Sequence, residues 1–525
     1  MKRLLWVDDE IDLLRAHTIF LEKRGYEVVT CSNGRDALDL CRKNDYDLIL
    51  LDENMPGISG LETLEGIKDV KPHIPVVMVT KNEAEDLMDQ AIGAKIADYL
   101  LKPVNPMQIL LVLKKHIHER EIRQEQTETG YRNDFSQIGM QIQDDLSANE
   151  WKELYKRLVR WELELAESDP TASGPMADML KMQKEEANVT FAKYIRSNYE
   201  KWMVDRLNNN TETSPLMSPD IMKRLVFPRL SEGRKVILLV LDNFRFDQWR
   251  MLSKELSDEF DIEENMYFSI LPTATQYARN SIFSGLLPLQ IREMYPHLWV
   301  DEEEDEPKNQ NEQELIRLQL ERFRRKENFT YHKLNDSSHV DKFLSQGVNA
   351  IPLDTPLHVI VINFIDILSH ARTESQMVRE LARGEAAYRS ITLSWFQHTS
   401  VKDIFHNLAQ RDCDIIVTTD HGSIRVDNPV KILGDRNVNT NLRYKFGKNM
   451  QYQKKDVFEI KDPKKVGLPA PNLSTTYVFA QGDKFLAYPN NYNYYVQYYR
   501  DTFQHGGVSL EEMLIPLITL KPKKR

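Results

Sequence analysis

Five short segments in the second half of the 525-residue chain carry side chains that bind hard metal ions or act as nucleophiles. In chain order they contribute Asp242, Thr275, the pair Asp366 and His370, the pair Asp420 and His421, and His505. So many carboxylates and imidazoles around one hydroxyl suit chemistry on an anionic ester, because two divalent ions about 4 Å apart can clamp the attacking and leaving oxygens of an in-line displacement. The sequence therefore predicts a metallo-hydrolase of phosphate esters, with the Thr275 hydroxyl as nucleophile. Thr273 is a second candidate by chemistry alone.

The apolar stretches before these residues predict how the residues come together. Residues 236–241, 358–364 and 415–419 are rich in β-branched apolar side chains, as buried parallel strands are. Asp242 and Asp420 each follow one run at once, and Asp366 follows the third. Because open α/β sheets bind ligands at the carboxyl ends of their strands, we expect the three carboxylates at one edge of a sheet.

Each segment also has a purely structural interpretation. Thr275 is a possible cap of the helix that follows it. Asp366 and His370 have the spacing of a solvated pair on a helix face, and 420–422 is an ordinary turn sequence. Three chance placements at strand ends are improbable together, so we favour the metal site.

The order and spacing of these residues resemble the alkaline phosphatase superfamily, which includes phosphodiesterases, phosphatases, sulfatases and PglZ-type domains. Arg279, Gly285 and Pro288 follow Thr275 at the spacing of sulfatase-like members, a spacing that Thr273 does not fit.

The resemblance also implies two ligand sets. One ion is expected on Asp242, Asp420, His421 and the Thr275 hydroxyl, and the other on Asp366, His370 and His505. Mixed carboxylate and imidazole ligands suit zinc, with manganese as a substitute.

The first hundred residues alternate apolar strands with polar residues that end them. The strands at 4–7, 48–51, 76–79 and 97–101 are followed by Asp8-Asp9, Asp52, Thr80 and Lys102. This pattern resembles the receiver domain of two-component response regulators.

The receiver resemblance assigns a role to each of these residues. It implies Asp52 as the phosphoacceptor, Lys102 as its charge partner, Thr80 as the hydroxyl that follows the phosphate and Tyr99 as the aromatic switch residue. It also implies a Mg²⁺ bound by Asp8, Asp9, Asp52 and the Asn54 carbonyl. The alternative, that Asp8 and Asp9 only cap the first helix, leaves Asp52, Thr80 and Lys102 unexplained.

Residues 119–210 are polar and charged, and they predict helices that connect the two halves. Trp151, Leu154, Leu158, Trp161 and Leu165 recur at alternating spacings of three and four, which makes a single apolar seam. Breaks are expected at 169–170 and 174–175, a second helix over 176–207 and a loop over 208–215. The seam favours a small bundle core over a partner-binding surface.

We therefore predict a receiver over 1–120, a helical connector over 121–214 and a metal-dependent domain over 215–525. The fold class is α/β: a doubly wound receiver with five parallel strands, a helical connector and an α/β domain of the alkaline phosphatase superfamily.

The composition of the chain indicates in which compartment the protein is expected. Three cysteines without a C-x-x-C motif fit a reducing compartment, and no segment reaches the ~18 apolar residues of a membrane span, so a cytoplasmic location is expected. A formal net charge of −11 disfavours sequence-specific binding of duplex DNA.

A few residues are candidates for substrate binding. Arg245 and Arg279 lie close in sequence to Asp242 and Thr275. Arg443 is a candidate for binding a phosphodiester oxygen, and a basic loop on the surface is the equally weighted alternative. The tyrosines from 488 to 499 are candidates for stacking on nucleobases, although packing against the sheet is the favoured role.

The whole chain resembles the PorX-type response regulators, which join a receiver to a PglZ-like domain. The resemblance implies a sensor histidine kinase upstream, a role in type IX secretion, a sigma factor or secretion component as partner, and a short or cyclic oligonucleotide as substrate. The main functional prediction is a phosphorylation-controlled phosphodiesterase that forms a homodimer when phosphorylated. The alternative is an adaptor with a non-catalytic metal domain. Sulfatase chemistry is disfavoured because position 275 is not cysteine or serine, and direct promoter binding comes last.

Overall fold

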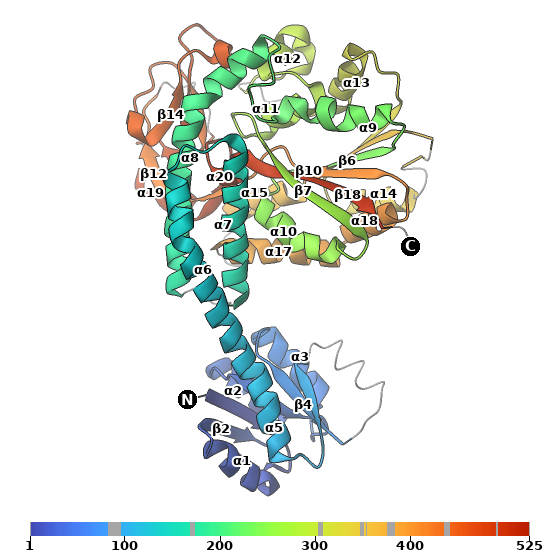
Figure 1. Cartoon of the computed structure of the whole chain (residues 1–525), viewed down its shortest axis with the longest axis vertical. Helices are drawn as coiled ribbons and strands as arrows, with labels where there is room; N and C mark the ends of the chain where they lie inside the picture. The colour runs from blue at the N-terminus through green and yellow to red at the C-terminus, as the bar shows by residue number, and fades with distance from the viewer. Residues whose placement is uncertain are drawn as a thin grey trace. The chain divides into compact units, whose positions relative to one another are not determined.

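The computed structural model describes residues 2–81, 96–168, 174–302, 308–346, 351–352, 354–374, 384–434, 441–489 and 492–523. Two compact units are formed, one by Met1–Asp134 with Glu164–Ala177 and the other by Phe135–Leu163 with Asp178–Arg525 (Figure 1). Among the described residues, no helix is both long and apolar enough to cross a membrane.

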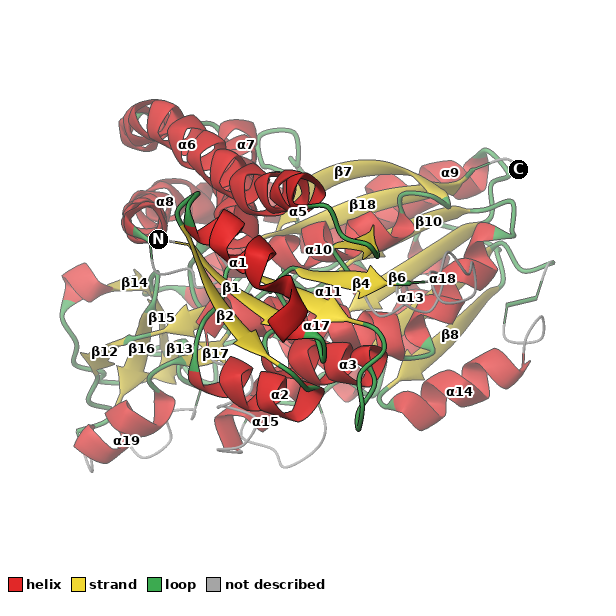
Figure 2. Cartoon of the chain, turned by 90° about the horizontal axis from the view of Figure 1, so that it is seen from below, coloured by secondary structure: helices red, strands yellow, loops and turns green. Residues whose placement is uncertain are grey.

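The first unit contains a five-stranded parallel sheet in the order β2-β1-β3-β4-β5. Its strands are β1 (Lys2–Val7), β2 (Tyr26–Cys31), β3 (Leu48–Asp52), β4 (Val76–Thr80) and β5 (Asp98–Leu101). Figure 2 shows α1 (Arg15–Glu22) and α5 (Pro106–Leu113) on one side of the sheet, and α2 (Gly34–Lys43) and α3 (Gly60–Val70) on the other. Short helical turns η1 (Ile11–Leu14) and η2 (Lys114–His118) flank these helices.

The strands of this sheet contribute side chains to two separate hydrophobic cores, one on each face. Leu4 and Trp6 pack in the core with α1 and α5, whereas Leu5 and Val7 pack in the opposite one. Successive side chains of a strand point to opposite faces, so a continuous apolar run is what a sheet covered on both faces requires. The doubly wound receiver fold predicted from the sequence is confirmed.

Long helices follow the receiver. They are α6 (Glu119–Gln143), α7 (Ala148–Ser168) and α8 (Pro175–Leu207). The five apolar residues of the predicted seam on α7 are all buried. The expected break at 174–175 coincides with the start of α8 at Pro175, and the break at 169–170 lies outside the described residues.

The second unit is built on a six-stranded mixed sheet in the order β7-β18-β10-β6-β9-β8. Its members are β6 (Val236–Leu241), β7 (Phe260–Phe268), β8 (Phe329–Leu334), β9 (Leu357–Ile362), β10 (Asp414–Thr418) and β18 (Leu514–Pro522). Strands β10, β6, β9 and β8 run parallel, and β18 is antiparallel to both of its neighbours, β10 and β7. Figure 1 shows α11 (Thr275–Ser284) and α13 (Glu312–Arg322) on one face, with α10 (Phe246–Leu256), α17 (Gly384–His398) and α18 (Val401–Ala409) on the other.

Shorter elements complete this unit. Helical segments are η3 (Ser218–Asp220), η4 (Met222–Val226), α9 (Phe227–Ser231), α12 (Pro288–Met294), η5 (Pro296–Leu298), α14 (Ser337–Gln346), α15 (Phe364–Glu374), η7 (Lys454–Asp456), η8 (Pro463–Val466), α19 (Tyr492–Tyr499) and α20 (Leu510–Met513). Small sheets pair β11 (Ile424–Val426) with β17 (Thr502–Gln504), β12 (Asn428–Lys431) with β16 (Lys484–Ala487), and β15 (Thr476–Ala480) with both β13 (Tyr444–Gly447) and β14 (Val457–Ile460).

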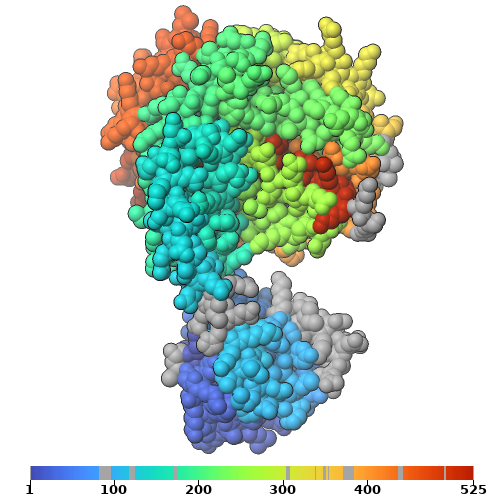
Figure 3. All heavy atoms as spheres, in the orientation of Figure 1, coloured from blue at the N-terminus to red at the C-terminus, as the bar shows by residue number. Residues whose placement is uncertain are grey.

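Part of the helical connector packs against the six-stranded sheet and its flanking helices within this unit. Figure 3 shows the cyan and green atoms of α7 and α8 lying against the remainder of the unit. Asn188 of α8 donates to Glu511 at 3.1 Å, and its side-chain oxygen accepts from the Leu510 backbone N–H at 2.8 Å. Arg389 of α17 donates to Glu162 of α7 at 2.6 Å. These polar contacts fix α8 onto α20 and α7 onto α17.

Candidate active site

The strand register brings two predicted carboxylates together. Val240 of β6 pairs with Thr418 of β10 in parallel, so Asp242 and Asp420, each two residues further on, reach the same edge. Ligand atoms of Asp242, Asp420 and His421 all lie within 4.8 Å of one another, and the three side chains are buried.

His421 is held in the tautomer that a metal ligand needs. Its Nδ1 lies 3.1 Å from the Gly422 carbonyl oxygen, which can only accept, so Nδ1 carries the hydrogen. The lone pair is then on Nε2, which lies 3.9 Å from an oxygen of Asp242 and 3.8 Å from one of Asp420. These separations are too long for hydrogen bonds and fit ligands on a shared ion with bonds of ~2.0–2.2 Å.

The Thr275 hydroxyl lies beside the first set of predicted ligands. Thr275 is the first residue of α11, its N-cap is Ala274 and the helix has no side-chain cap, so the capping interpretation is wrong. The Thr275 hydroxyl lies 3.1 Å from His421 Nε2 and 3.5 Å from an Asp242 oxygen. It therefore sits among the first ligand set.

Thr273 has a structural role. Its buried hydroxyl donates to the Gly507 carbonyl at 3.0 Å and accepts from the Gly506 N–H at 3.0 Å. Its own carbonyl oxygen lies 3.1 Å from Nδ1 of His505. Thr273 thus positions His505 and has no free hydroxyl for chemistry.

The second ligand set is adjacent to the first. With the His505 Nδ1 hydrogen donated to Thr273, its Nε2 lone pair lies 3.8 Å from an Asp366 oxygen. The His421 and His505 rings stack with centroids 4.2 Å apart. His370 lies one turn after Asp366 in α15, and its side chain is outside the described part of the chain.

The position of Asp366 corrects one strand boundary. The run predicted as a strand over 358–364 forms β9 only to Ile362, and Asp366 lies in the first turn of α15. Asn363 and Phe364 leave the ladder because Phe364 already begins the helix. The carboxylate still reaches the sheet edge, where Asn243 donates to it at 3.3 Å.

Arg279 contacts the carboxylates of the first set. Its guanidinium is buried, 2.5 Å from Asp242, 3.0 Å from Asp420 and 3.4 Å from Glu312. Burial by itself would raise the pKa of Asp420, but Arg279 and backbone hydrogen bonds, among them one from the Asn243 N–H, hold that pKa at about 2. Burial raises the pKa of Asp242 well above its ordinary range even though Arg279 opposes the shift.

The donor chemistry therefore fits a divalent cation. Arg279 and Lys333, which lies 3.0 Å from Glu312, supply two positive charges against three carboxylates. Two oriented imidazoles with lone pairs facing carboxylates are the remaining ingredients of zinc or manganese ligation. Asp242, Asp420, His421 and the Thr275 hydroxyl would hold one ion, and Asp366 and His505 would contribute to the second.

The three arginines predicted to bind substrate all contact internal carboxylates. Arg245 lies 2.5 Å from both Asp247 and Glu385, and Arg443 lies 2.6 Å from Glu512. Each guanidinium is almost completely buried, as is that of Arg279. These guanidiniums pair with internal carboxylates in the structure, and their role in substrate binding stays a prediction.

Two further residues were missed by sequence reasoning. Glu512 accepts from the Gly507 N–H at 2.9 Å and from Arg443, and so holds the loop that carries His505. The spacing from Ser509 to Glu512 is a capping-box pattern and was a usable signal. Asn243, with φ of 59°, donates to Asp366 and Ser369, and the sequence offers no comparable signal for it.

The receiver residues also meet at the end of their sheet. Asp8, Asp9 and Asp52 offer ligand atoms within 4.8 Å of one another. Lys102 lies 2.9 Å from both Asp8 and Asp52. Burial raises the pKa of Asp52, and Lys102 opposes this. Three carboxylates against one ammonium fit a Mg²⁺ ion there.

The two switch residues lie on β4 and β5. Thr80 donates to Glu53, Tyr99 is 42% exposed, and Asn54 is exposed just after β3. Tyr99 is therefore free to change its environment.

Three family models match the chain in order. They are the response regulator receiver domain over residues 4–114, the PorX response regulator linker domain over 121–203 and the BREX system PglZ alkaline phosphatase-like domain over 221–520. The last spans more than half of the chain. The chain belongs to the PglZ family. With a receiver and linker before its PglZ domain, it has the PorX-type response-regulator architecture.

Other similarities concern the receiver. It is 37% identical over 120 residues to the alginate biosynthesis transcriptional regulatory protein AlgB of Pseudomonas syringae, covering 23% of this chain and 27% of that protein. It is 32% identical over 123 residues to the alkaline phosphatase synthesis transcriptional regulatory protein PhoP of Bacillus subtilis, covering 23% of this chain and 50% of that one. The chain thus spans about a quarter to a half of these relatives. The chemotaxis protein CheY4 of Vibrio cholerae is 30% identical, with 22% of this chain and 98% of that chain covered and a TM-score of 0.21.

These matches establish the broad class. The PglZ domain indicates a hydrolase of the phosphoesterase type, and the receiver implies a phosphodonor such as a sensor kinase. Both domain types imply bound metal ions. The domain boundaries at 120 and 214 remain predictions.

Proposed function

We propose that the PglZ domain is a phosphodiesterase that uses two zinc ions, with manganese as a substitute, and Thr275 as its nucleophile. The observation that carries this proposal is the Thr275 hydroxyl, 3.1 Å from His421 Nε2 within the first ligand set, beside a second set reached through the stacked His505. An adaptor would not need a nucleophile at this point. Phosphorylation of Asp52 in a Mg²⁺-bound receiver is proposed to control the activity.

The reaction has two displacements. The Thr275 oxygen forms a bond to phosphorus while the bond from phosphorus to one ester oxygen breaks, and the departing alcohol takes up a proton. Water then attacks the same phosphorus, the bond to Thr275 breaks, and the hydroxyl regains its hydrogen. Bound divalent ions would stabilise charge on the attacking and leaving oxygens.

Residues of the chain orient these steps. The N-terminus of α11 directs its partial positive charge toward a phosphate placed at Thr275. Thr273 and Glu512 fix the loop of His505, and Arg279 fixes Asp242 and Asp420. The nucleophile and both ligand sets are thus held before substrate arrives.

The charge of the site supports a diester substrate. A monoester carries an additional negative charge that further cations must offset, and Arg245, Arg279 and Arg443 are all committed to internal carboxylates. The receiver domain supports a sensor histidine kinase as phosphodonor. From the resemblance to PorX-type regulators we further propose a short or cyclic oligonucleotide as substrate, and a role in type IX secretion with a sigma factor or secretion component as partner.

Hydrolysis of bis(p-nitrophenyl) phosphate and p-nitrophenyl phosphate by the zinc-loaded full chain tests this function. We expect a higher kcat/KM for the diester. Acid quenching during turnover should trap an adduct on Thr275 that retains one nitrophenyl ester. Preference for the monoester, or an adduct elsewhere, contradicts the proposal. A chain that binds zinc but hydrolyses neither compound supports the adaptor.

A further inference from the structure

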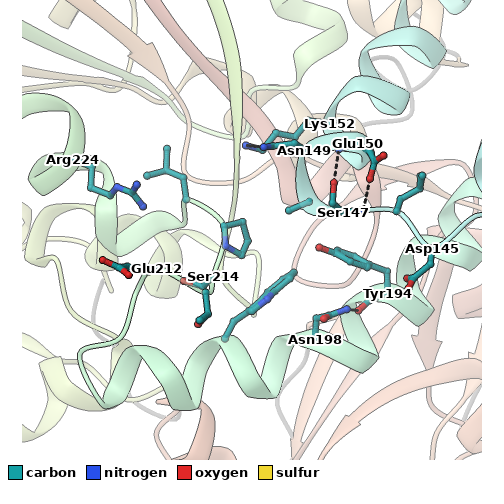
Figure 4. A pocket seen from close by; sticks show the side chains of 16 residues that line it. Asp145, Ser147, Asn149, Glu150, Lys152, Tyr194, Asn198, Glu212, Ser214 and Arg224 are labelled. Atoms are coloured by element: carbon teal, nitrogen blue, oxygen red, sulfur yellow. Dashed lines mark hydrogen bonds between the residues drawn. The ribbon is translucent and has the colours of Figure 1, made fainter.

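A second pocket lies in the second unit, among residues to which no role has been assigned. It has a volume of about 740 Å³ and is formed by the N-terminal turn of α7, the middle of α8, the loop before η3, and η4. That volume lies in the ~300–1,000 Å³ range of small-molecule sites. Figure 4 shows Lys152 and Asn149 together on one wall, Tyr194 and Asn198 on the wall facing them, and Arg224 on a third side.

The central feature of this pocket is a buried ammonium, that of Lys152, which forms no ion pair with a carboxylate in the described part of the chain. Lys152 is only 8% exposed, and its Nζ donates to Asn149 Oδ1 at 3.3 Å. Among the described residues it has no ion pair with a carboxylate, since the neighbouring Glu153 pairs with Lys156. Burial lowers the pKa of Lys152 accordingly. A buried charge without a partner is costly, so an anionic ligand here would relieve that cost.

The remaining walls suit a planar ring. Trp202 packs edge-on against Tyr194, with ring centroids 5.6 Å apart, in a cluster that continues to Trp151 and Phe191. Figure 4 shows the Tyr194 side chain extending into the pocket. The amides of Asn149 and Asn198 add donors and acceptors at the edges of such a ring. Aromatic walls with a few polar groups are typical of nucleotide sites.

The charges at the rim limit how negative the ligand is. Arg224 is exposed and adds a second cation, while Asp145 and Glu212 are exposed acids at the border of the pocket. The third acid, Glu150, is already bonded to the Ser147 backbone N–H at 2.8 Å. A backbone hydrogen bond leaves the Glu150 carboxylate charged, so two cations face three acids here, and a triphosphate is disfavoured relative to a single phosphate group.

We propose that this pocket binds a nucleoside monophosphate or a comparable mononucleotide unit, with the phosphate on Lys152 and Arg224 and the base against Tyr194. The site is separate from the catalytic residues and independent of the proposed hydrolase activity. Its ligand would bridge the linker helices α7 and α8 to the first segment of the PglZ domain.

Equilibrium dialysis of radiolabelled adenosine 5′-monophosphate tests the proposal. The full chain carries Thr275→Val in every arm, so that the nucleotide is not turned over. Lys152→Met keeps the length of the side chain but removes its charge, and we expect at least tenfold weaker binding. The matched control is Lys156→Met, one turn further along α7, which should bind as before. ATP should compete at least tenfold less well than the monophosphate, and adenosine and inorganic phosphate should each bind more weakly.

A second pair of variants tests the proposal even if Lys152→Met does not fold. Arg224 is exposed, so Arg224→Ala should fold normally and weaken binding, whereas Lys223→Ala should not. Photolabelling with 8-azidoadenosine 5′-monophosphate should mark the α8 peptide that contains Tyr194. Equal binding by the Lys152 and Lys156 variants, labelling confined to catalytic peptides, or an absence of saturable binding would each overturn the proposal.

Discussion

The Thr275 hydroxyl lies 3.1 Å from Nε2 of His421, whereas the hydroxyl of Thr273, two residues earlier, is bonded to the loop that carries His505. Two threonines of one segment therefore serve different ligand sets. The difference separates a nucleophile from a positioning residue and can be measured.

The first prediction concerns these two threonines. Thr275→Val should keep both metal ions and lower diester hydrolysis by several orders of magnitude, because only the attacking oxygen is removed. Thr273→Val should instead weaken metal binding, because His505 loses its support. Metal analysis with kcat for both variants checks this. Near-normal turnover by a metal-loaded Thr275→Val protein rules out Thr275 as nucleophile.

The second prediction separates the two ions. His421→Ala and His505→Ala should each lower zinc content, and we expect each to lose mainly one equivalent, because the two imidazoles serve different carboxylates. Stoichiometry measured by atomic emission after dialysis is the readout. The exposed His398→Ala is the control. Retention of two zinc ions by either active-site variant contradicts the ligand assignment.

The third prediction concerns the contact between linker and catalytic elements. Glu162 lies 2.6 Å from both Lys184 and Arg389, and although burial raises its pKa, these cations hold the pKa below its ordinary range. Glu162→Gln should lower the free energy of unfolding by about 1.5–3 kcal/mol near pH 7, since Lys184 and Arg389 lose this carboxylate and keep Glu511 at 3.4 Å and Asp247 at 3.2 Å as partners.

The sign of the pH dependence follows from the lowered pKa of Glu162. The contribution of the carboxylate is complete above its unfolded pKa of about 4.3 and is lost as the pH falls through the lower folded value. The difference in the free energy of unfolding between the wild-type chain and Glu162→Gln should therefore become smaller only in strong acid. Urea denaturation is the measurement, with the exposed Glu153→Gln as control, expected to cost at most about 1 kcal/mol. A similar loss in both variants would contradict the prediction.

The fourth prediction concerns acid stability. Burial lowers the pKa of His358 on β9 to about 4. Below its unfolded pKa of about 6.5 the unfolded chain takes up a proton that the folded chain refuses, so stability should fall by about 2 kcal/mol between pH 6.5 and 4, after allowance for solvent screening. His358→Gln should remove this decline and exposed His398→Gln should not. If the free energy of unfolding of the two variants depends on pH in the same way, the decline does not come from His358.

The strand ends of the catalytic site were predictable from the sequence, and the charge network was not. Continuous apolar runs located β6 and β10, and parallel pairing then required Asp242 and Asp420 to meet. Arg245 pairs with Glu385, more than a hundred residues later in the chain. Arg443 pairs with Glu512, about seventy residues later. The local sequence gives the charge of an arginine but not its distant partner. An arginine that binds substrate therefore could not be distinguished from one buried in an internal ion pair.

The last prediction concerns activation through the receiver. We expect the dimer contact on residues 83–118; of these, Tyr99 of β5 and Met107 and Leu111 of α5 are exposed, and 83–95 lie outside the described residues. An exposed apolar surface beside Thr80 and Lys102 suits a symmetric contact that forms when Asp52 carries a phosphoryl group. Beryllofluoride should therefore convert the chain to a dimer and change diester turnover by ~5- to 100-fold, as 1–3 kcal/mol of coupling would produce.

Mass in solution and turnover, each measured with and without beryllofluoride, check this coupling. Asp52→Ala should respond in neither measurement. Leu111→Glu should still bind the mimic but stay monomeric, because a charge replaces an apolar contact, whereas Lys43→Glu on the opposite side of the sheet should dimerise. If the wild-type chain binds beryllofluoride with no change in mass or turnover, the receiver does not control the catalytic site through this face. Partner binding would then be the output of phosphorylation.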